Sequence, residues 1–231
     1  MKTEDKYGKT FYIKRGSEAE REDLAGLLVE AFYGMMKPIT HNKAKLRGLF
    51  LPYIHPERFL IAADAGDKVM GMAALSDRED PCMTIDEEHA RSSFFRPKGY
   101  IVGRILQAEF DRSQLKKGQG HLECVAVAEP YQKRGIARRL LEELTEETDY
   151  RFYTLDVIEG NESVMRLYEK VGFALQGRSK VSLSLLKGYR YEYQMKKLPD
   201  GFPEKTAVQT GNEASSAKTA QSSEATPMRP S

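Results

Sequence analysis

One stretch of the chain decides its fold: residues 127–141, which read VAEPYQKRGIARRLL. Residues 122–127 (LECVAV) are mostly apolar and rich in β-branched side chains, which is typical of a buried strand. The residues after it place apolar side chains at helical spacing, at Ala137, Leu140, Leu141 and Leu144. The basic turn between them, 132–137, contains small residues that let a ligand approach the backbone closely. Because a helix N-terminus favours an anion, the stretch predicts a site for a phosphate or pyrophosphate.

The spacing of this turn differs from that of other common phosphate-binding loops. The chain contains neither Gly-x-x-x-x-Gly-Lys-Ser/Thr nor Gly-x-Gly-x-x-Gly. The turn instead resembles the acetyl-CoA loop of the GNAT acyltransferase superfamily, Gln/Arg-x-x-Gly-x-Gly/Ala, which reads Gln132-x-x-Gly135-x-Ala137 here. An ordinary connection between a strand and a helix can also match six residues, so this motif alone leaves both interpretations open.

A second segment supports the same resemblance. Residues 153–158 (YTLDVI) predict another strand, and residues 161–173 (NESVMRLYEKVGF) predict a helix. Asn161 stands at the N-cap of that helix, and Gly172 stands where a left-handed residue ends it. The segment is similar to the second GNAT signature, Asn-x-x-Ala-x-x-Leu-Tyr-x-Lys-x-Gly-Phe, and departs from it at Val164. With both motifs in order, the chain is identified as a member of the GNAT superfamily of acetyl-CoA-dependent N-acetyltransferases.

The resemblance implies an α/β (α+β) fold: a mixed, mostly antiparallel twisted sheet flanked by helices, with a V-shaped splay between two parallel central strands. Patterns elsewhere fit such a sheet. They predict a strand at 11–15, a helix at 18–32 capped by Ser17, a hairpin of 58–63 and 68–75, and a closing strand at 189–195.

We expect the acetyltransferase domain to span residues 8–198, with an insertion at 76–120 before the cofactor-binding strand. The insertion contains a predicted helix at about 100–114. Its aromatic side chains suggest a pocket for a small acceptor, although they can equally be core residues: Phe94, Phe95 and Tyr100. From 199 to 231, Thr, Ser, Ala, Gln, Glu and Pro dominate, which predicts a disordered tail.

Composition limits the functional classes. The chain has 36 Lys and Arg against 34 Asp and Glu, which gives no global basis for binding nucleic acid. The N-terminus has no apolar leader, and no stretch approaches the roughly 18 apolar residues that span a bilayer. Cys82 and Cys124 are far apart in the sequence and show no metal-ligand spacing. We therefore expect a reduced, cytoplasmic protein without a metal, a nucleic-acid partner or a membrane.

Two residues of the predicted strand are candidates for a general base. Attack on a thioester needs a neutral amine, whereas a primary amine has a pKa of about 10.4. His121 and Glu123 are two residues apart, so we expect them on one face together with Val125 and Val127. The resemblance implies that a Glu or His at these positions is the base. His121 can also be an exposed residue at the start of the strand, and Glu123 can be a structural salt-bridge partner.

Two residues of the second predicted helix are candidates for contacts with the donor. Tyr168 resembles the general acid of the family, which protonates the departing thiolate, but it also completes an apolar stripe and can be a core residue. Asn161 precedes it by seven residues, which places both on one face of the helix, about 10 Å apart. A backbone N–H near Val127 is expected to hold the thioester carbonyl.

The sequence therefore predicts an enzyme that moves an acetyl group from acetyl-CoA to a primary amine of an unidentified acceptor by direct attack in a ternary complex. A small-molecule acceptor is favoured over a protein, and the chain is expected to be a monomer or homodimer. The alternative is a non-catalytic acyl-CoA-binding regulatory module; a nucleic-acid binder ranks third, without a motif or a basic excess. Expected cofactor contacts are Val125, Val127, Gln132, Lys133, Arg134, Gly135, Ile136, Ala137, Arg138 and Asn161.

Overall fold

A single mixed sheet organises the computed structural model, which describes residues 2–5, 7–181 and 189–199. Its strands are β1 (Lys2–Glu4), β2 (Thr10–Arg15), β3 (Phe59–Ala63), β4 (Val69–Ser76), β5 (Gln119–Val127), β6 (Phe152–Ile158), β7 (Ala174–Lys180) and β8 (Tyr191–Lys197). They lie in the order β1-β2-β3-β4-β5-β6-β8-β7. Every described pairing is antiparallel except that of β5 with β6. The predicted fold class is confirmed.

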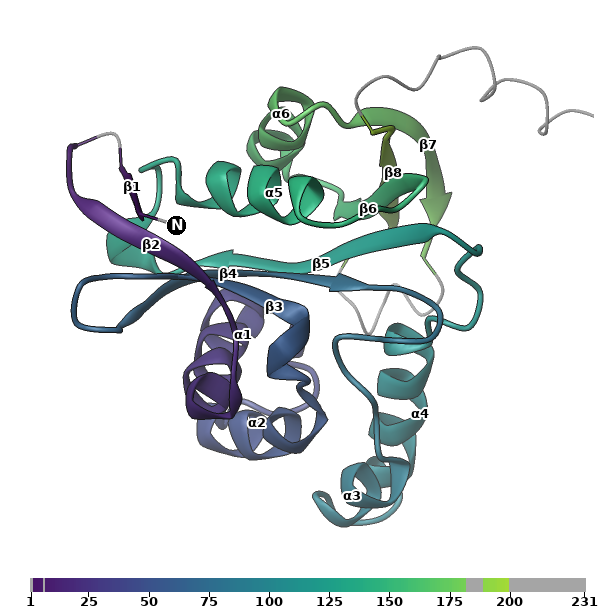
Figure 1. Ribbon diagram of the computed structural model, residues 1–231. Coiled ribbons are helices and arrows are strands. Elements are labelled where there is room, and N and C mark those ends of the chain that lie inside the picture. The colour runs from purple at the N-terminus through teal and green to yellow at the C-terminus, as the bar shows by residue number, and fades with distance from the viewer. Residues whose placement is uncertain (1, 6, 182–188, 200–231) are drawn as a thin grey trace, which may run out of the picture. The chain divides into compact units, whose positions relative to one another are not determined.

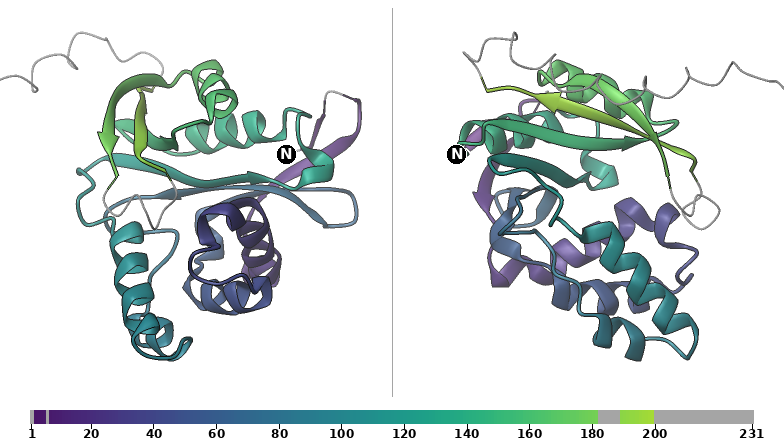
Figure 2. Two further views of the ribbon diagram at one scale, coloured as in Figure 1. Left: turned by 180° about the vertical axis from the view of Figure 1, so that it is seen from behind. Right: turned by 90° about the vertical axis from the view of Figure 1, so that its right-hand side faces the viewer.

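Helices cover both faces of the sheet (Figure 1). One face carries α5 (Ile136–Glu146) and α6 (Glu162–Lys170), and we call it the α5 face. The other, the α1 face, carries α1 (Arg21–Met36), α2 (Lys43–Phe50), α3 (Glu87–Ser92) and α4 (Lys98–Phe110). The same two layers are seen from behind and from the side in Figure 2. Each face has its own cluster of buried apolar side chains, so the sheet separates two cores.

Most predicted elements are present with shifted ends. Ser17 begins the first helix as predicted, and its N–H donates to the Glu20 carboxylate at 2.9 Å. The first turn there is a 3-10 turn, and α1 then continues to Met36, beyond the predicted end. The predicted hairpin is β3 and β4, and the helix of the insertion is α4, which ends at Phe110. Helices α2 and α3 and strands β1 and β7 were not predicted.

Residues Met1–Pro199 form one compact unit. Apart from Pro199, the predicted tail lies outside the described residues. Among the helices of the described ranges, none has the length and apolar character needed to cross a membrane.

Strands β5 and β6 run side by side only at their beginnings. Their described pairs are Gln119 with Phe152, Gly120 with Tyr153, and His121 with Thr154. Beyond that point β5 remains paired with β4, and β6 remains paired with β8. The two parallel strands therefore diverge after His121 and Thr154, which is the splay predicted from the resemblance.

A bulge in β5 lies directly on the splay. Between the pairs Met72 with Ala126 and Ala74 with Glu123, β5 contains one residue more than β4. Cys124, within that interval, has a left-handed backbone with φ of 54°. A bulge of this kind interrupts the hydrogen-bond ladder and redirects the side chains that follow it.

Candidate active site

The bulge changes which β5 side chains face together. Leu122 packs into the α5-face core, whereas Ala126, four residues later, packs into the α1-face core. In a regular strand an even spacing would place both on one face. Val125 and Val127 contact the α5-face core, and Cys124 contacts the α1-face core.

His121 and Glu123 precede the bulge and lie on the α1 side, together with Ser76 of β4 and Cys82. The prediction that they share a face with Val125 and Val127 is therefore wrong. The physical reason is the single extra residue, which reverses the alternation of side chains beyond it.

Glu123 forms a two-point ion pair with Arg112, which follows α4. Arg112 Nε donates to Oε1 at 3.1 Å, and Nη2 donates to Oε2 at 2.5 Å. Both side chains are largely buried, with 15% of Arg112 and 10% of Glu123 exposed. Burial by itself would raise the pKa of Glu123, but hydrogen bonding and charge from Arg112 hold that pKa below its ordinary value. The carboxylate is thus a poor proton acceptor near neutral pH.

Ser76 connects this ion pair to the loop after β4. Its hydroxyl donates to Glu123 Oε1 and accepts from the N–H of Cys82 at 2.7 Å.

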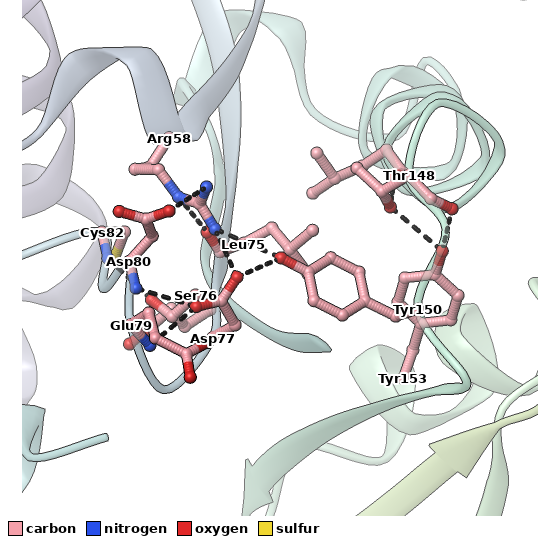
Figure 3. A network of polar contacts seen from close by, with 12 residues as sticks. Arg58, Leu75, Ser76, Asp77, Glu79, Asp80, Cys82, Thr148, Tyr150 and Tyr153 are labelled. Atoms are coloured by element: carbon pink, nitrogen blue, oxygen red, sulfur yellow. Dashed lines mark hydrogen bonds and ion pairs between the residues drawn. The ribbon is translucent and has the colours of Figure 1, made fainter. Parts of the chain in front are cut away.

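Figure 3 shows the same end of β4, where Arg58 and Asp77 contact Tyr150. The network holds β4 against the segment that leads into β6, at the closed end of the splay.

The fold brings together the two cysteines, which are far apart in the sequence. The sulfurs of Cys82 and Cys124 and a carboxylate oxygen of Glu123 all lie within 4.8 Å of one another. Both cysteines are free thiols. Arg112 already engages both carboxylate oxygens of Glu123, which makes this group a poor set of metal ligands.

His121 lies at the last β5–β6 pair, on the α1 face. Its Nδ1 lies 3.0 Å from Thr154 Oγ1, and the same oxygen accepts a hydrogen bond from Gln119 Nε2 at 2.8 Å. His121 Nε2 lies 3.9 Å from Asp156 Oδ2. Burial lowers the pKa of His121 below 6.5, with Glu123 and Asp156 opposing this shift and Arg112 reinforcing it. A neutral imidazole in this place can accept a proton.

Tyr168 approaches the splay from the α5 face. Its side chain is buried in that core and its ring packs edge-on against Phe173, at 6.1 Å between centroids. Burial raises the pKa of the phenol, and Cys124 of the β5 bulge raises it further. Its hydroxyl makes no hydrogen bond to another described residue and remains available as a donor. The raised pKa keeps the phenol protonated near neutral pH.

The turn before α5 has the backbone geometry of an anion site. Gly135 is the N-cap of α5 and has a φ of 90°, which glycine adopts without strain. The N–H of Arg139 is the first to bond within the helix, to Gly135 O at 3.0 Å. The N–H groups of Ile136, Ala137 and Arg138 therefore have no partner within the helix and point out of its N-terminus. The side chain of Ile136 packs into the α5-face core.

The basic side chains of this turn are less concentrated than the sequence suggests. Arg134 donates to Pro130 O at 2.6 Å and contacts the buried Asp5 carboxylate at 3.4 Å. Arg138 pairs along its helix with Glu142 at 2.7 Å. Lys133 is exposed, and Gln132 donates to the carbonyl of Val127 at 3.0 Å. Backbone amides rather than a ring of cations dominate the site.

Asn161 begins α6, as predicted, but its side chain makes no capping bond to the helix. Gly172 ends the helix with a φ of 96°, also as predicted.

The aromatic residues of the insertion do not converge. Phe94 is buried in the α1-face core, whereas Phe95 is 92% exposed and Tyr100 is 55% exposed. The expected aromatic-lined pocket is not formed by these three residues.

Two charged residues of the site were missed by the sequence analysis. Arg112 follows a helix whose end was predicted too late, and nothing local connects it to Glu123. Asp156 carried a signal, because it is the one charged residue of the strand segment 153–158. A carboxylate in such a segment is costly unless it is paired or used.

Comparison with known proteins places these features in a family. A family model described as the acetyltransferase (GNAT) family matches residues 29–173, more than half of the chain. The chain belongs to the GNAT family. As a GNAT acetyltransferase it is an acyltransferase enzyme, and both sequence motifs lie within the matched range.

Solved structures share the fold of this GNAT protein at low identity. An N-acetyltransferase from Staphylococcus aureus Mu50 is 19% identical with a TM-score of 0.56, covering 80% of this chain and 99% of that chain. A ribosomal-protein-alanine N-acetyltransferase from Brucella melitensis is 21% identical with a TM-score of 0.52, covering 81% and 99%. A search of curated proteins finds no match. At these identities the likeness concerns the fold alone.

Proposed function

We propose that this GNAT enzyme transfers an acetyl group from acetyl-CoA to a primary amine by direct attack in a ternary complex. One observation carries the proposal: a neutral imidazole and a protonated phenol approach the β5–β6 splay from opposite faces of the sheet. Direct transfer requires such an arrangement, because the amine must be deprotonated on one side of the thioester while the thiolate is protonated on the other.

The donor would bind on the α5 face. The N-terminus of α5 offers amide groups for the pyrophosphate, with Gly135 allowing close approach and Lys133 adding charge. The arm of the cofactor would then follow β5 along Val127 and Val125. The side chain of Asn161, which does not cap its own helix, would contact the same arm.

Peptide groups of β5 would polarise the thioester carbonyl. The N–H of Ala128 donates to Met70 O of β4, so the N–H of the preceding residue, Val127, points to the opposite edge. That edge faces the splay, where β6 has already diverged. The extra residue of the bulge also lies outside the regular ladder. Amides in these places can stabilise the negative charge that develops on the carbonyl oxygen.

We assign the general base to His121 rather than Glu123. The ion pair with Arg112 lowers the pKa of Glu123, which weakens it as a base, whereas the imidazole of His121 is kept neutral by burial. Glu123 would instead stabilise the site as a structural salt-bridge partner, which is the other interpretation that its sequence position allows.

The proton balance of the reaction closes with these groups. His121 Nε2 takes a proton from the acceptor ammonium, and the neutral amine attacks the thioester carbon. The C–N bond forms, the C–S bond breaks, and Tyr168 donates its proton to the thiolate. The second proton lost by the amine nitrogen restores the phenol, and His121 releases its proton to solvent. An ammonium ion and a thioester thereby become an amide, a thiol and one free proton.

An assay of CoA thiol release with a panel of amines tests the proposal. The panel should contain diamines, polyamines, amino acids and peptides with free N-termini, because the exposed aromatics of the insertion no longer favour a small acceptor. We expect release only with an amine present, a mass gain of one acetyl group on that amine, and intersecting initial-rate lines. Tight binding of acetyl-CoA without turnover on any amine would instead support the regulatory module.

A further inference from the structure

Asp156 lies where β6 leaves β5, facing His121. Thr154 is the last β6 residue paired with β5, and Asp156 follows it by two positions, so both point to the face that carries His121. Thr154 Oγ1 engages His121 Nδ1, which turns Nε2 toward Asp156. The Asp156 side chain is 42% exposed, whereas that of His121 is 13% exposed. The carboxylate is therefore the more solvent-accessible of the two groups.

The distance between the two groups suits a third atom. At 3.9 Å, His121 Nε2 and Asp156 Oδ2 are too far apart for a direct hydrogen bond. One nitrogen at about 2.8 Å from each atom would subtend an angle of about 90°, which is accessible to two N–H bonds of an ammonium group. With its hydrogen on Nδ1, His121 donates to Thr154 and leaves Nε2 as an acceptor.

We propose that Asp156 is the acceptor-binding residue, holding the substrate ammonium nitrogen between its Oδ2 and His121 Nε2. The inference rests on the proposed function and deepens it, because it states how the amine is held before His121 takes its proton. The bound ammonium donates one hydrogen to each residue. When His121 has taken its proton, the neutral amine remains bonded to Asp156 with its lone pair released for attack on the thioester.

The surroundings of Asp156 contain both signs of charge. Burial raises the pKa of Asp156; His121 and Arg112 oppose this shift, whereas Glu109 and Glu123 add to it. Tyr189 also lies within electrostatic reach. Arg112 is already paired with Glu123, whose side chain is 10% exposed, whereas Asp156 lies 3.9 Å from His121 and is 42% exposed. A cationic nucleophile should therefore be preferred over a neutral one.

Kinetics of Asp156→Asn on the full chain test the proposal, with the best amine from the panel as substrate. We expect KM for that amine to rise about 10- to 100-fold, the size expected for losing one hydrogen bond to a charged group. The dissociation constant of acetyl-CoA, measured by calorimetry, should stay within about 2-fold, because the donor binds on the other face. Asp156→Glu, which keeps the charge, should recover part of the affinity. Asp149→Asn changes an exposed carboxylate before β6 and is the matched control, with unchanged KM.

A neutral nucleophile separates charge recognition from a structural role. Hydroxylamine is largely uncharged at neutral pH, so Asp156→Asn should affect its acetylation far less than that of the cationic amine. An equal loss with both nucleophiles, or an unchanged KM for the cationic amine, overturns the role of Asp156 while the transferase assignment stands. Absence of turnover by the unaltered chain on every amine overturns the proposed function and this inference with it.

Discussion

Arg112 binds both carboxylate oxygens of Glu123, through Nε at 3.1 Å and Nη2 at 2.5 Å. The pair joins the segment after α4 to the strand that carries the bulge, and both partners are largely buried. Breaking one half of such a pair leaves an uncompensated buried charge, which costs far more than the loss of an exposed ion pair. The pair is therefore expected to matter for stability more than for proton transfer.

Glu123→Gln should lower the free energy of unfolding by about 3–5 kcal/mol at neutral pH, because Arg112 then keeps a buried charge without a partner. The folded-state pKa of Glu123 lies below its ordinary value of 4.5, so this stabilisation is present above pH 4.5. It is lost as pH falls through the lowered folded-state pKa. Denaturant unfolding at several pH values measures it. Glu142→Gln, which breaks the exposed pair with Arg138, is the control and should cost less than about 1 kcal/mol. If the stability difference between Glu123→Gln and the unaltered chain persisted unchanged into strong acid, the ion pair with Arg112 would not be its cause.

His121→Asn should lower kcat/KM for the amine by about 10²–10⁴-fold with little change in acetyl-CoA affinity. In the unaltered enzyme the rate should rise with pH as the imidazole loses its proton, with a midpoint below 6.5 because burial lowers the pKa of His121. The variant should lack this acidic limb. Rate–pH profiles of His121→Asn and Glu123→Gln show which residue is the base. If the acidic limb survives in His121→Asn and disappears in Glu123→Gln, Glu123 is the base.

Tyr168→Phe should reduce turnover by about 10²–10⁴-fold while the fold remains as stable as before. Its hydroxyl has no partner among the described residues, and its ring packing is kept in the variant. Tyr153→Phe gives the opposite result, because the Tyr153 hydroxyl donates to the carbonyl of Thr145 at 3.1 Å. That variant should lose about 0.5–1.5 kcal/mol of stability and keep its turnover. Wild-type turnover in Tyr168→Phe, measured where chemistry limits the rate, would remove the general-acid assignment.

Gly135→Glu should abolish acetyl-CoA binding, because a side chain and a negative charge would lie where the pyrophosphate approaches. Space alone does not forbid the substitution, since nothing lies within 4 Å of a Cβ added at Gly135. Gly8→Glu is a close control: Gly8 also has a positive φ, of 72°, and open space around its Cβ. Calorimetric titration of both folded variants gives the result. Equal affinity in the two would mean that the turn before α5 does not bind the phosphates.

The sequence alone determined the strand–turn–helix frame, the fold class and the family. The frame rests on local signals: apolar spacing in α5 and α6, and glycines at Gly135 and Gly172 where the backbone is left-handed. The family, and the fold class with it, came from the resemblance of the two motifs to the GNAT signatures. Each signal is set by a few neighbouring residues and by backbone sterics, so it can be detected without knowing the rest of the chain.

Only the tertiary structure decided which side chains meet at the site. The bulge at Cys124 depends on how β5 pairs with β4. Its one extra residue places the side chains of Glu123 and Val125 on opposite faces of the sheet. The contacts of Glu123 with Arg112 and of His121 with Asp156 join separate elements. Local periodicity contains no information about such pairings, because they arise from strand register and helix packing across the whole domain.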